Sequence, residues 1–184
     1  MGRGIFRIFV LLLLLRLSAF ASDTPNIFID VPFVQQQKDG CGAAVIAMVM
    51  QYWQQHDGHA AGPASDAAHI YDALYSPAAH GVYSTGMLRY FQQNGYRAFA
   101  FAGDRSDIER HLAKGRPLIV ALNPGAHLPL HYVVVAGLEP DQHVVLVNDP
   151  AQRKLLKQDD VQFDQQWKAA GHWTLLAVPE AGAR

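Results

Sequence analysis

The sequence has little cysteine and little charge of either sign. Its 184 residues include one cysteine, 17% are charged, and the formal net charge is -1. Proteins that bind nucleic acid usually carry a strongly basic surface, so no nucleic-acid partner is expected. Internal repeats, charge runs and low-complexity tracts are also absent, which argues against solenoids and disordered tails. Half of the residues are hydrophobic, as expected for one globular domain of this length.

The N-terminal segment differs from the rest of the chain. Arg3 and Arg7 precede an unbroken apolar run over residues 8–15, and Arg16 ends that run. A basic start followed by a short apolar stretch is typical of a secretory signal peptide. The apolar run is shorter than the roughly 20 residues that a membrane-spanning helix needs.

Ala19 and Ala21 provide the small-x-small pattern at which signal peptidase cleaves. We therefore expect residues 1–21 to be a cleaved signal peptide and residues 22–184 to form the mature domain. Such a domain would be exported to the periplasm or the extracellular space. The alternative is an uncleaved N-terminal anchor, and only then would the domain be attached to a membrane.

The mature chain is expected to be helical in its first half and rich in strands in its second. The segment GAAVIAMVMQYWQQH contains good helix formers with a wide apolar face. The later segments PLIVAL, YVVV and VVLV are largely β-branched and are separated by turn residues. This order indicates an α+β fold, with a helical lobe packed on an antiparallel sheet. The expected strands are 26–33, 96–101, 117–122, 132–135, 144–147 and 173–178. The expected helices are 42–57, 63–75, 106–114 and 159–170. A further helix is expected to be capped by Ser84 or Thr85 and to end at Gly95.

Cys41 follows the turn Lys38-Asp39-Gly40 and opens the first expected helix. A lone cysteine of an exported protein forms no internal disulfide, so it is a buried filler, an intermolecular link or a reactive group. The unpaired N–H groups of a helix N-terminus favour the thiolate. Gly42 and Ala43 leave room for a substrate carbonyl, whose developing oxyanion would face the Cys41 N–H. We therefore predict that Cys41 is a nucleophile.

A nucleophilic thiol requires a base, a group that orients the base and a second oxyanion donor. Among nine histidines, His131 is the best candidate base because it opens the YVVV strand at the rim of the expected sheet. Asp149 follows the next strand and would accept a hydrogen bond from His131 Nδ1–H. Gln35, six residues before Cys41, is the candidate oxyanion donor, although Gln36 and Gln37 are alternatives in a different register.

The segments QQQKDGCGAAVIAMVMQYW, HYVVVAG and VNDP, in this order, resemble the C39 family of papain-like cysteine peptidases. That resemblance extends from about residue 31 to the last expected strand. It implies a papain-like fold with Cys41 as nucleophile, His131 as base, Asp149 as the orienting acid and Gln35 as the oxyanion glutamine. The family trims leader peptides after a double glycine, often as a domain of a peptide-exporting transporter. The chain lacks a transmembrane bundle and a P-loop, so it resembles the stand-alone members.

The expected activity is cleavage of a peptide or protein substrate, with a separate peptide-export transporter as a partner. An acyl transferase or transpeptidase would use the same residues, and a non-catalytic peptide-binding module of the cell envelope is a further alternative. Each site residue also has a structural explanation: a core cysteine, a strand-end histidine, a turn aspartate or a surface glutamine. The thiol mechanism implies no metal or organic cofactor. His56 and His59 have a spacing that a metal site could use, but Gly58 breaks the helix between them.

Overall fold

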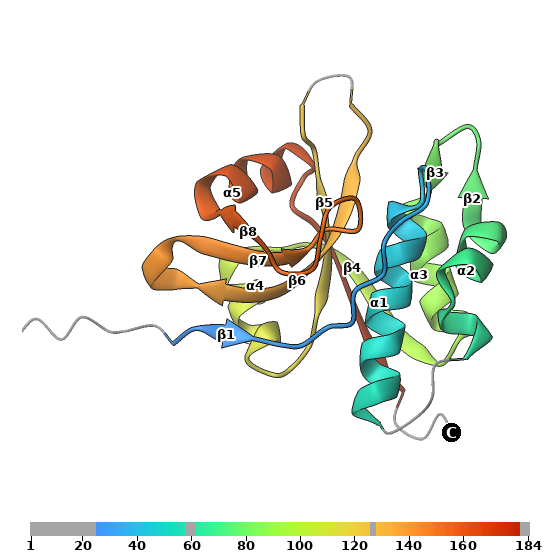
Figure 1. Cartoon of the computed structure of the whole chain (residues 1–184), viewed down its shortest axis with the longest axis horizontal. Coiled ribbons are helices and arrows are strands. Elements are labelled where there is room, and N and C mark those ends of the chain that lie inside the picture. The colour runs from blue at the N-terminus through green and yellow to red at the C-terminus, as the bar shows by residue number, and fades with distance from the viewer. Residues whose placement is uncertain (1–24, 58–61, 126–127, 181–184) are drawn as a thin grey trace, which may run out of the picture.

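The computed structural model describes residues 25–57, 62–125 and 128–180, which form a helical lobe beside a lobe built on a sheet (Figure 1). The predicted signal peptide and His59 lie outside the described residues. Within the described ranges no helix has the length and apolar character to cross a membrane. The α+β class predicted from the sequence is confirmed, with the helices first and most of the sheet second.

Helix α1 (Cys41–His56) lies at the boundary between the two lobes (Figure 1). Its residues from Gly42 to Met50 are all buried, so this part of the helix is covered on every side. Strand β6 (His131–Glu139) contacts it from the sheet lobe, and helices α2 (Ala67–Leu74) and α3 (Ser84–Gln93) contact it from the helical lobe. Each fully buried side chain of the size of Ile46 or Met48 contributes about 1.5–3 kcal/mol to folding. Helix α1 therefore holds the lobes together.

The sheet consists of antiparallel pairs whose central strands are buried along nearly their whole length. Strand β6 is the longest, and it pairs with β5 through its first half and with β1 and β7 through its second half. The spatial order is β4 (Tyr96–Ala102), β9 (Trp173–Pro179), β5 (Leu118–Leu122), β6 (His131–Glu139), β7 (Val144–Asn148) and β8 (Leu156–Asp159), with β1 (Ile27–Phe28) beside β6.

Two further helices pack on the sheet, and both begin with an aspartate cap. In α4 (Arg105–Leu112) the Asp104 carboxylate accepts from the Asp107 N–H, and the Asp107 carboxylate accepts from the Asp104 N–H. In α5 (Asp160–Ala169) the Asp159 carboxylate accepts from the Gln162 N–H at 3.0 Å. The remaining elements are the short helices η1 (Pro63–Ser65) and η2 (Pro140–Gln142) and the hairpin of β2 (Tyr75–Ser76) and β3 (Gly81–Val82).

Two local predictions were wrong, and one strand of the main sheet was missed. The expected strand over residues 26–33 pairs with β6 only at Ile27 and Phe28, because the chain then leaves the sheet to reach α1. Helix α3 already includes Ser84, and its cap residue Tyr83 makes no side-chain capping bond. Strand β8 was missed because its sequence LKQD is polar, as suits an edge strand.

Gly42 has a packing role that the sequence analysis did not predict. It was expected to leave room for substrate, but it is buried beneath the β2–β3 hairpin. A Cβ atom at Gly42 would lie 2.8 Å from Val82 Cβ and 3.3 Å from Val82 Cγ2. The first contact involves an atom attached directly to the backbone, so no side-chain rotation relieves it. The absence of a side chain here lets the hairpin close over the helix.

Gly42→Ala is therefore expected to destabilise the protein by about 1–3 kcal/mol through overpacking. Gly86→Ala in α3 is the matched control, because its Cβ would meet its nearest neighbours, in Leu74 and Val82, at 3.9 and 4.0 Å. That control should be neutral or stabilising by up to about 1 kcal/mol, since alanine is the better helix former. Urea unfolding measures both values, and equal effects of the two substitutions would contradict the packing argument.

Candidate active site

Cys41 is the first residue of α1 and is half-buried. The cap residue Gly40 has no side chain to satisfy the first N–H groups of the helix, and the first helical turn contains no acidic residue. These N–H groups therefore remain available to stabilise negative charge near the sulfur. Asp39 has a φ of 57°, in the left-handed region that an aspartate tolerates at a tight turn. The turn delivers the chain to the helix with the thiol at its tip.

His131 and Asp149 come from the neighbouring strands β6 and β7. His131 is the first residue of β6, and Asp149 directly follows the last residue of β7. Val134 lies opposite Asn148, so by continuation of the register Asp149 and His131 are diagonal neighbours on one face of the sheet. Their side chains meet, with His131 Nε2 at 2.7 Å from Asp149 Oδ1. A histidine and an aspartate 18 residues apart are thus brought into contact.

The ring nitrogen that contacts Asp149 is not the one expected. The sequence analysis assigned the bond to His131 Nδ1, whereas the structure has Nε2 in contact with the carboxylate. The diagonal offset between the two residues explains the difference, because Nε2 lies further from the backbone and reaches across it. Nδ1 is left on the other side of the ring.

Asp149 is held by more than the histidine. Its carboxylate is 6% exposed, Oδ1 also accepts from the Ala151 N–H at 2.9 Å, and Oδ2 accepts from Gln152 Nε2 at 2.6 Å. Burial alone raises the pKa of this carboxyl, but the hydrogen bonds and the charge of His131 outweigh it, so that the pKa lies below its usual value. Asp149 is therefore an anion with a fixed orientation. Gln152 was not predicted, because a single glutamine in a turn carries no sequence signal.

The protonated form of His131 is strongly favoured. Burial lowers the pKa of the ring, but hydrogen bonding with Asp149 and Cys41, together with the negative charges of both, raises the pKa to about 9. Cys41 is thus among the groups that raise the pKa of this ring. Tyr132 is affected too, since burial and then the charge of Cys41 raise its pKa to about 12. The three groups thus interact as thiol, imidazole and carboxylate.

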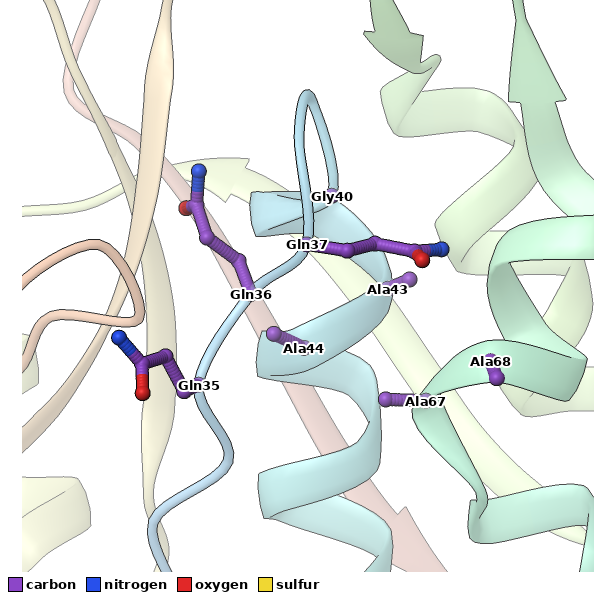
Figure 2. A pocket seen from close by; sticks show the side chains of 8 residues that line it. All are labelled: Gln35, Gln36, Gln37, Gly40, Ala43, Ala44, Ala67 and Ala68. Carbon is purple, nitrogen blue, oxygen red and sulfur yellow. The ribbon is translucent and has the colours of Figure 1, made fainter.

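The segment that carries the three glutamines is tied to the end of β7. The buried Asn148 donates through Nδ2 to the Val31 carbonyl at 3.0 Å, and the Gln36 N–H donates to the Pro150 carbonyl at 2.9 Å. Figure 2 shows the side chains of Gln35 and Gln36 on one side of this segment and that of Gln37 on the other, toward α2. The segment therefore runs between Asp149 and the start of α1.

The three glutamines have different environments. Gln35 and Gln37 are exposed, whereas Gln36 is half-buried. Within the described part of the chain, Gln36 Oε1 is buried without a hydrogen-bond partner. A crevice of about 210 Å³ separates this segment from the helices, and its far walls are alanines of α1 and α2 (Figure 2). The lining residues are Gln35, Gln36, Gln37, Gly40, Ala43, Ala44, Ala67 and Ala68.

No group of three or more histidine, cysteine, aspartate or glutamate side chains in the described ranges is arranged to hold a metal ion. His56 instead lies 3.5 Å from the carboxylate of its neighbour Asp57 at the end of α1. A thiol at a helix N-terminus, an imidazole and a buried carboxylate are the components of a nucleophilic cysteine site.

This combination of fold and site defines the class of papain-like α+β proteins, to which solved C39 peptidase domains belong. The peptidase domain of Streptococcus ComA, a bifunctional ABC transporter of a quorum-sensing pathway, superposes with a TM-score of 0.63 and 20% identity, over 82% of this chain and 100% of that one. A double-glycine-motif protease from an AMS/PCAT transporter, solved with its leader peptide, superposes with a TM-score of 0.61 and 22% identity, over 83% of this chain and 94% of that one.

The sequence profile of the Peptidase_C39 like family matches residues 28–174. The chain belongs to this family, as its sequence motifs predicted. A comparison with curated protein sequences found no match. The family match includes every residue that the sequence analysis selected as catalytic, together with all three glutamines.

The raised pKa of His131 is directly measurable. Nitrogen NMR of the ring should give a pKa of about 9 in the intact protein. Asp149→Asn should lower it, because the substitution removes the negative charge that favours the imidazolium. Asp141→Asn, in η2 beyond the far end of β6, is the control and should leave the value unchanged. A ring that titrates near 6.5 in the unsubstituted protein would contradict the ion-pair arrangement.

The same shift predicts how stability depends on pH. The folded pKa of about 9 exceeds the ordinary histidine value of 6.5, so protonation of His131 stabilises the folded state. This contribution, at most about 3 kcal/mol, is complete below pH 6.5 and is lost as the pH rises through 9. Denaturant unfolding at pH 6 and pH 10 should therefore differ less for His131→Gln than for the unsubstituted protein. An equal pH dependence in both would contradict the prediction.

Proposed function

We propose that the protein is a cysteine peptidase in which Cys41 is the nucleophile, His131 the acid–base residue and Asp149 the group that orients His131. The observation that carries this proposal is the contact of 2.7 Å between His131 Nε2 and a buried aspartate, on a ring whose pKa is also raised by Cys41 at the start of α1. A structural histidine needs neither a buried anion nor a thiol partner. These are the groups from which the proposed mechanism forms its thiolate–imidazolium pair.

The reaction follows from these positions. The Cys41 thiolate attacks the substrate carbonyl, and the resulting oxyanion is stabilised by N–H groups at the start of α1. His131, protonated because of its raised pKa, donates a proton from Nδ1 to the leaving amine, and an acyl-enzyme remains. The neutral imidazole then takes a proton from water, which attacks the thioester and releases the acid. Asp149 holds the ring in one orientation through both steps.

Gln36 is the better candidate for the second oxyanion donor. The sequence analysis chose Gln35 and left Gln36 and Gln37 open. Gln35 is exposed, and the side chain of Gln37 extends away toward α2, whereas the Gln36 side chain extends to the other side with its Oε1 buried (Figure 2). The bond between the Gln36 N–H and the Pro150 carbonyl also anchors this residue next to Asp149. We therefore assign the role to Gln36.

The proposed substrate is a peptide or protein, delivered outside the cell's cytoplasm if residues 1–21 act as a signal peptide. Double-glycine leader peptides are the first substrates to test, because a protease of similar fold was solved with such a leader. The alanine walls of the crevice beside Gln36 and Gln37 are compatible with small substrate residues. A separate peptide-export transporter would be the source of such a substrate.

Cys41 is expected to react rapidly with iodoacetamide near neutral pH, and Cys41→Ala should abolish peptide cleavage. Asp149→Asn should lower kcat by about 10²- to 10⁴-fold while leaving measurable turnover, since the carboxylate orients the base rather than reacting. Steady-state kinetics and mass spectrometry of the labelled protein provide the measurements. Labelling at the rate of an ordinary thiol, with no peptide cleaved, would rule out the peptidase proposal.

Substitution of each glutamine tests the oxyanion assignment. Gln36→Ala should lower kcat by about 10²- to 10³-fold with little change in KM, because the lost interaction acts mainly in the transition state. Gln35→Ala and Gln37→Ala are matched controls from the same segment and should retain most of the activity. A large loss confined to Gln35→Ala would instead support the original assignment from residue spacing.

A further inference from the structure

The turn that follows β7 brings a glutamine side chain onto the Asp149 carboxylate. The Gln152 N–H donates to the Asp149 carbonyl at 2.9 Å, and the Asp149 N–H donates to the Arg153 carbonyl at 3.1 Å. Pro150, the second residue of this turn, restricts its backbone further. The turn therefore holds the backbone of Gln152 close to Asp149, and the side chain folds back so that Nε2 lies 2.6 Å from Asp149 Oδ2.

The two oxygens of the Asp149 carboxylate have different partners. Oδ1 contacts His131 Nε2 at 2.7 Å and accepts from the Ala151 N–H at 2.9 Å. Among the residues that the structure describes, Gln152 alone donates to Oδ2. A carboxylate that is bonded through both oxygens cannot rotate without losing one of these bonds. Gln152 therefore determines the orientation in which Asp149 meets the imidazole.

This contact joins an exposed side chain to a buried one. Gln152 is exposed, whereas the Asp149 side chain is 6% exposed. A glutamine loses conformational entropy when it is held in one rotamer, and an exposed position offers little packing in return. A hydrogen bond to an ionised acceptor is strong enough to offset that loss. The carboxylate, rather than the core, thus holds the side chain of Gln152 in place, so substitution here should not disturb folding.

A cavity of about 280 Å³ lies on this side of the ion pair, and His131, Asp149 and Gln152 all line it. Its other walls come from the end of β5, from β8 and from α5. Water that enters this space would compete for the oxygens of Asp149 and weaken its interaction with the imidazole. Because Gln152 already occupies Oδ2, it limits this competition.

The other charged groups that line the cavity have partners of their own. Lys157 of β8 donates to Glu139 at 2.6 Å, and the Asp159 carboxylate caps the start of α5. The charged partner of Asp149 is His131 of β6. A change at Gln152 should therefore act on the pair of Asp149 and His131 and leave the other ion pairs as they are.

We propose that Gln152 is a positioning residue for the peptidase reaction: it fixes the Asp149 carboxylate, and through it the His131 ring, in the orientation that proton transfer to the leaving amine requires. This inference rests on the proposed peptidase function and adds one residue to it. In this scheme Gln152 acts only through Asp149 and touches neither the thiol nor the substrate. Its loss should therefore slow turnover and leave substrate binding nearly unchanged.

Gln152→Met keeps the length of the side chain and removes the donor. We expect kcat to fall about 10- to 100-fold with little change in KM, the range for a hydrogen bond to a charged group. Gln162→Met is the matched control, because Gln162 is also exposed and lines the same cavity but is not among the hydrogen-bond partners of Asp149. This control should keep its full activity. Urea unfolding of both variants verifies that they are folded.

Gln152→Glu distinguishes positioning from a general structural effect. When protonated, the introduced carboxyl donates its O–H to Asp149 as the amide does; when ionised, it repels Asp149. Because Asp149 is already an anion, this carboxyl keeps its proton above its ordinary pKa of about 4.3. Relative to the unsubstituted protein at the same pH, kcat should be within about threefold at pH 5 and should fall to the level of Gln152→Met at pH 8. Gln162→Glu should give the same ratio at both pH values.

The proton on His131 Nε2 gives a readout that needs no turnover. A proton held between the ring and the carboxylate should produce a far-downfield signal in proton NMR that exchanges slowly with water. Gln152→Met should accelerate this exchange about tenfold or more, because the carboxylate is no longer fixed, whereas Gln162→Met should leave it unchanged.

The outcomes separate the two proposals. Cleavage of no peptide by the unsubstituted protein would reject the peptidase function, and the NMR signal would then decide by itself whether Gln152 fixes the pair. If kcat and proton exchange in Gln152→Met match those in Gln162→Met, the positioning role is overturned while the peptidase stands. A loss in Gln152→Glu that is equal at pH 5 and pH 8 would overturn it as well, since the effect would not depend on a donor to Asp149.

Discussion

The need to bury helix α1 on every side determines the layout of the molecule. A helix whose residues 42–50 are all buried cannot form the surface of either lobe, so both lobes must cover it. Its axis therefore lies at their boundary, and its N-terminus opens where the lobes separate. Cys41 occupies that end, and His131 belongs to β6, a strand of the sheet lobe that contacts the helix. The burial of α1 between the two lobes thus brings Cys41, at the start of the helix, to the side of the sheet lobe that carries His131.

The charges at this boundary are maintained against an unfavourable environment. Burial acts against both the imidazolium of His131 and the carboxylate of Asp149, and in each case it is the largest single influence on the pKa. The hydrogen bonds and charges that the groups exchange nevertheless prevail, which requires close and well-directed contacts. Gln152 and the Ala151 N–H supply such contacts to Asp149. A loosely held carboxylate in the same place would be poorly able to keep the histidine protonated.

Much of the fold and several site residues could be predicted from sequence because their signals are local. The helix after Cys41 is long enough to show an apolar face in its sequence, and the β-branched strands are long enough to appear as continuous apolar stretches. The orientation of the His131 ring could not be predicted, since it depends on a diagonal offset between two strands. The choice among Gln35, Gln36 and Gln37 depends on how an irregular segment turns. Strand β8 could not be predicted either, because its own residues are polar and it is defined by its pairing with β7.

Asn148 shows how structural and catalytic roles become linked in such a site. Its buried amide holds the Val31 carbonyl at 3.0 Å, and its oxygen accepts from the Leu155 N–H at 3.0 Å. Asn148 therefore connects two segments of the chain: the one that leads to the three glutamines and the turn that contains Asp149. A change at this asparagine would therefore displace the segment of Gln36 and the carboxylate of Asp149 together. We therefore expect Asn148 and Asp149 to be retained together in proteins that share this arrangement.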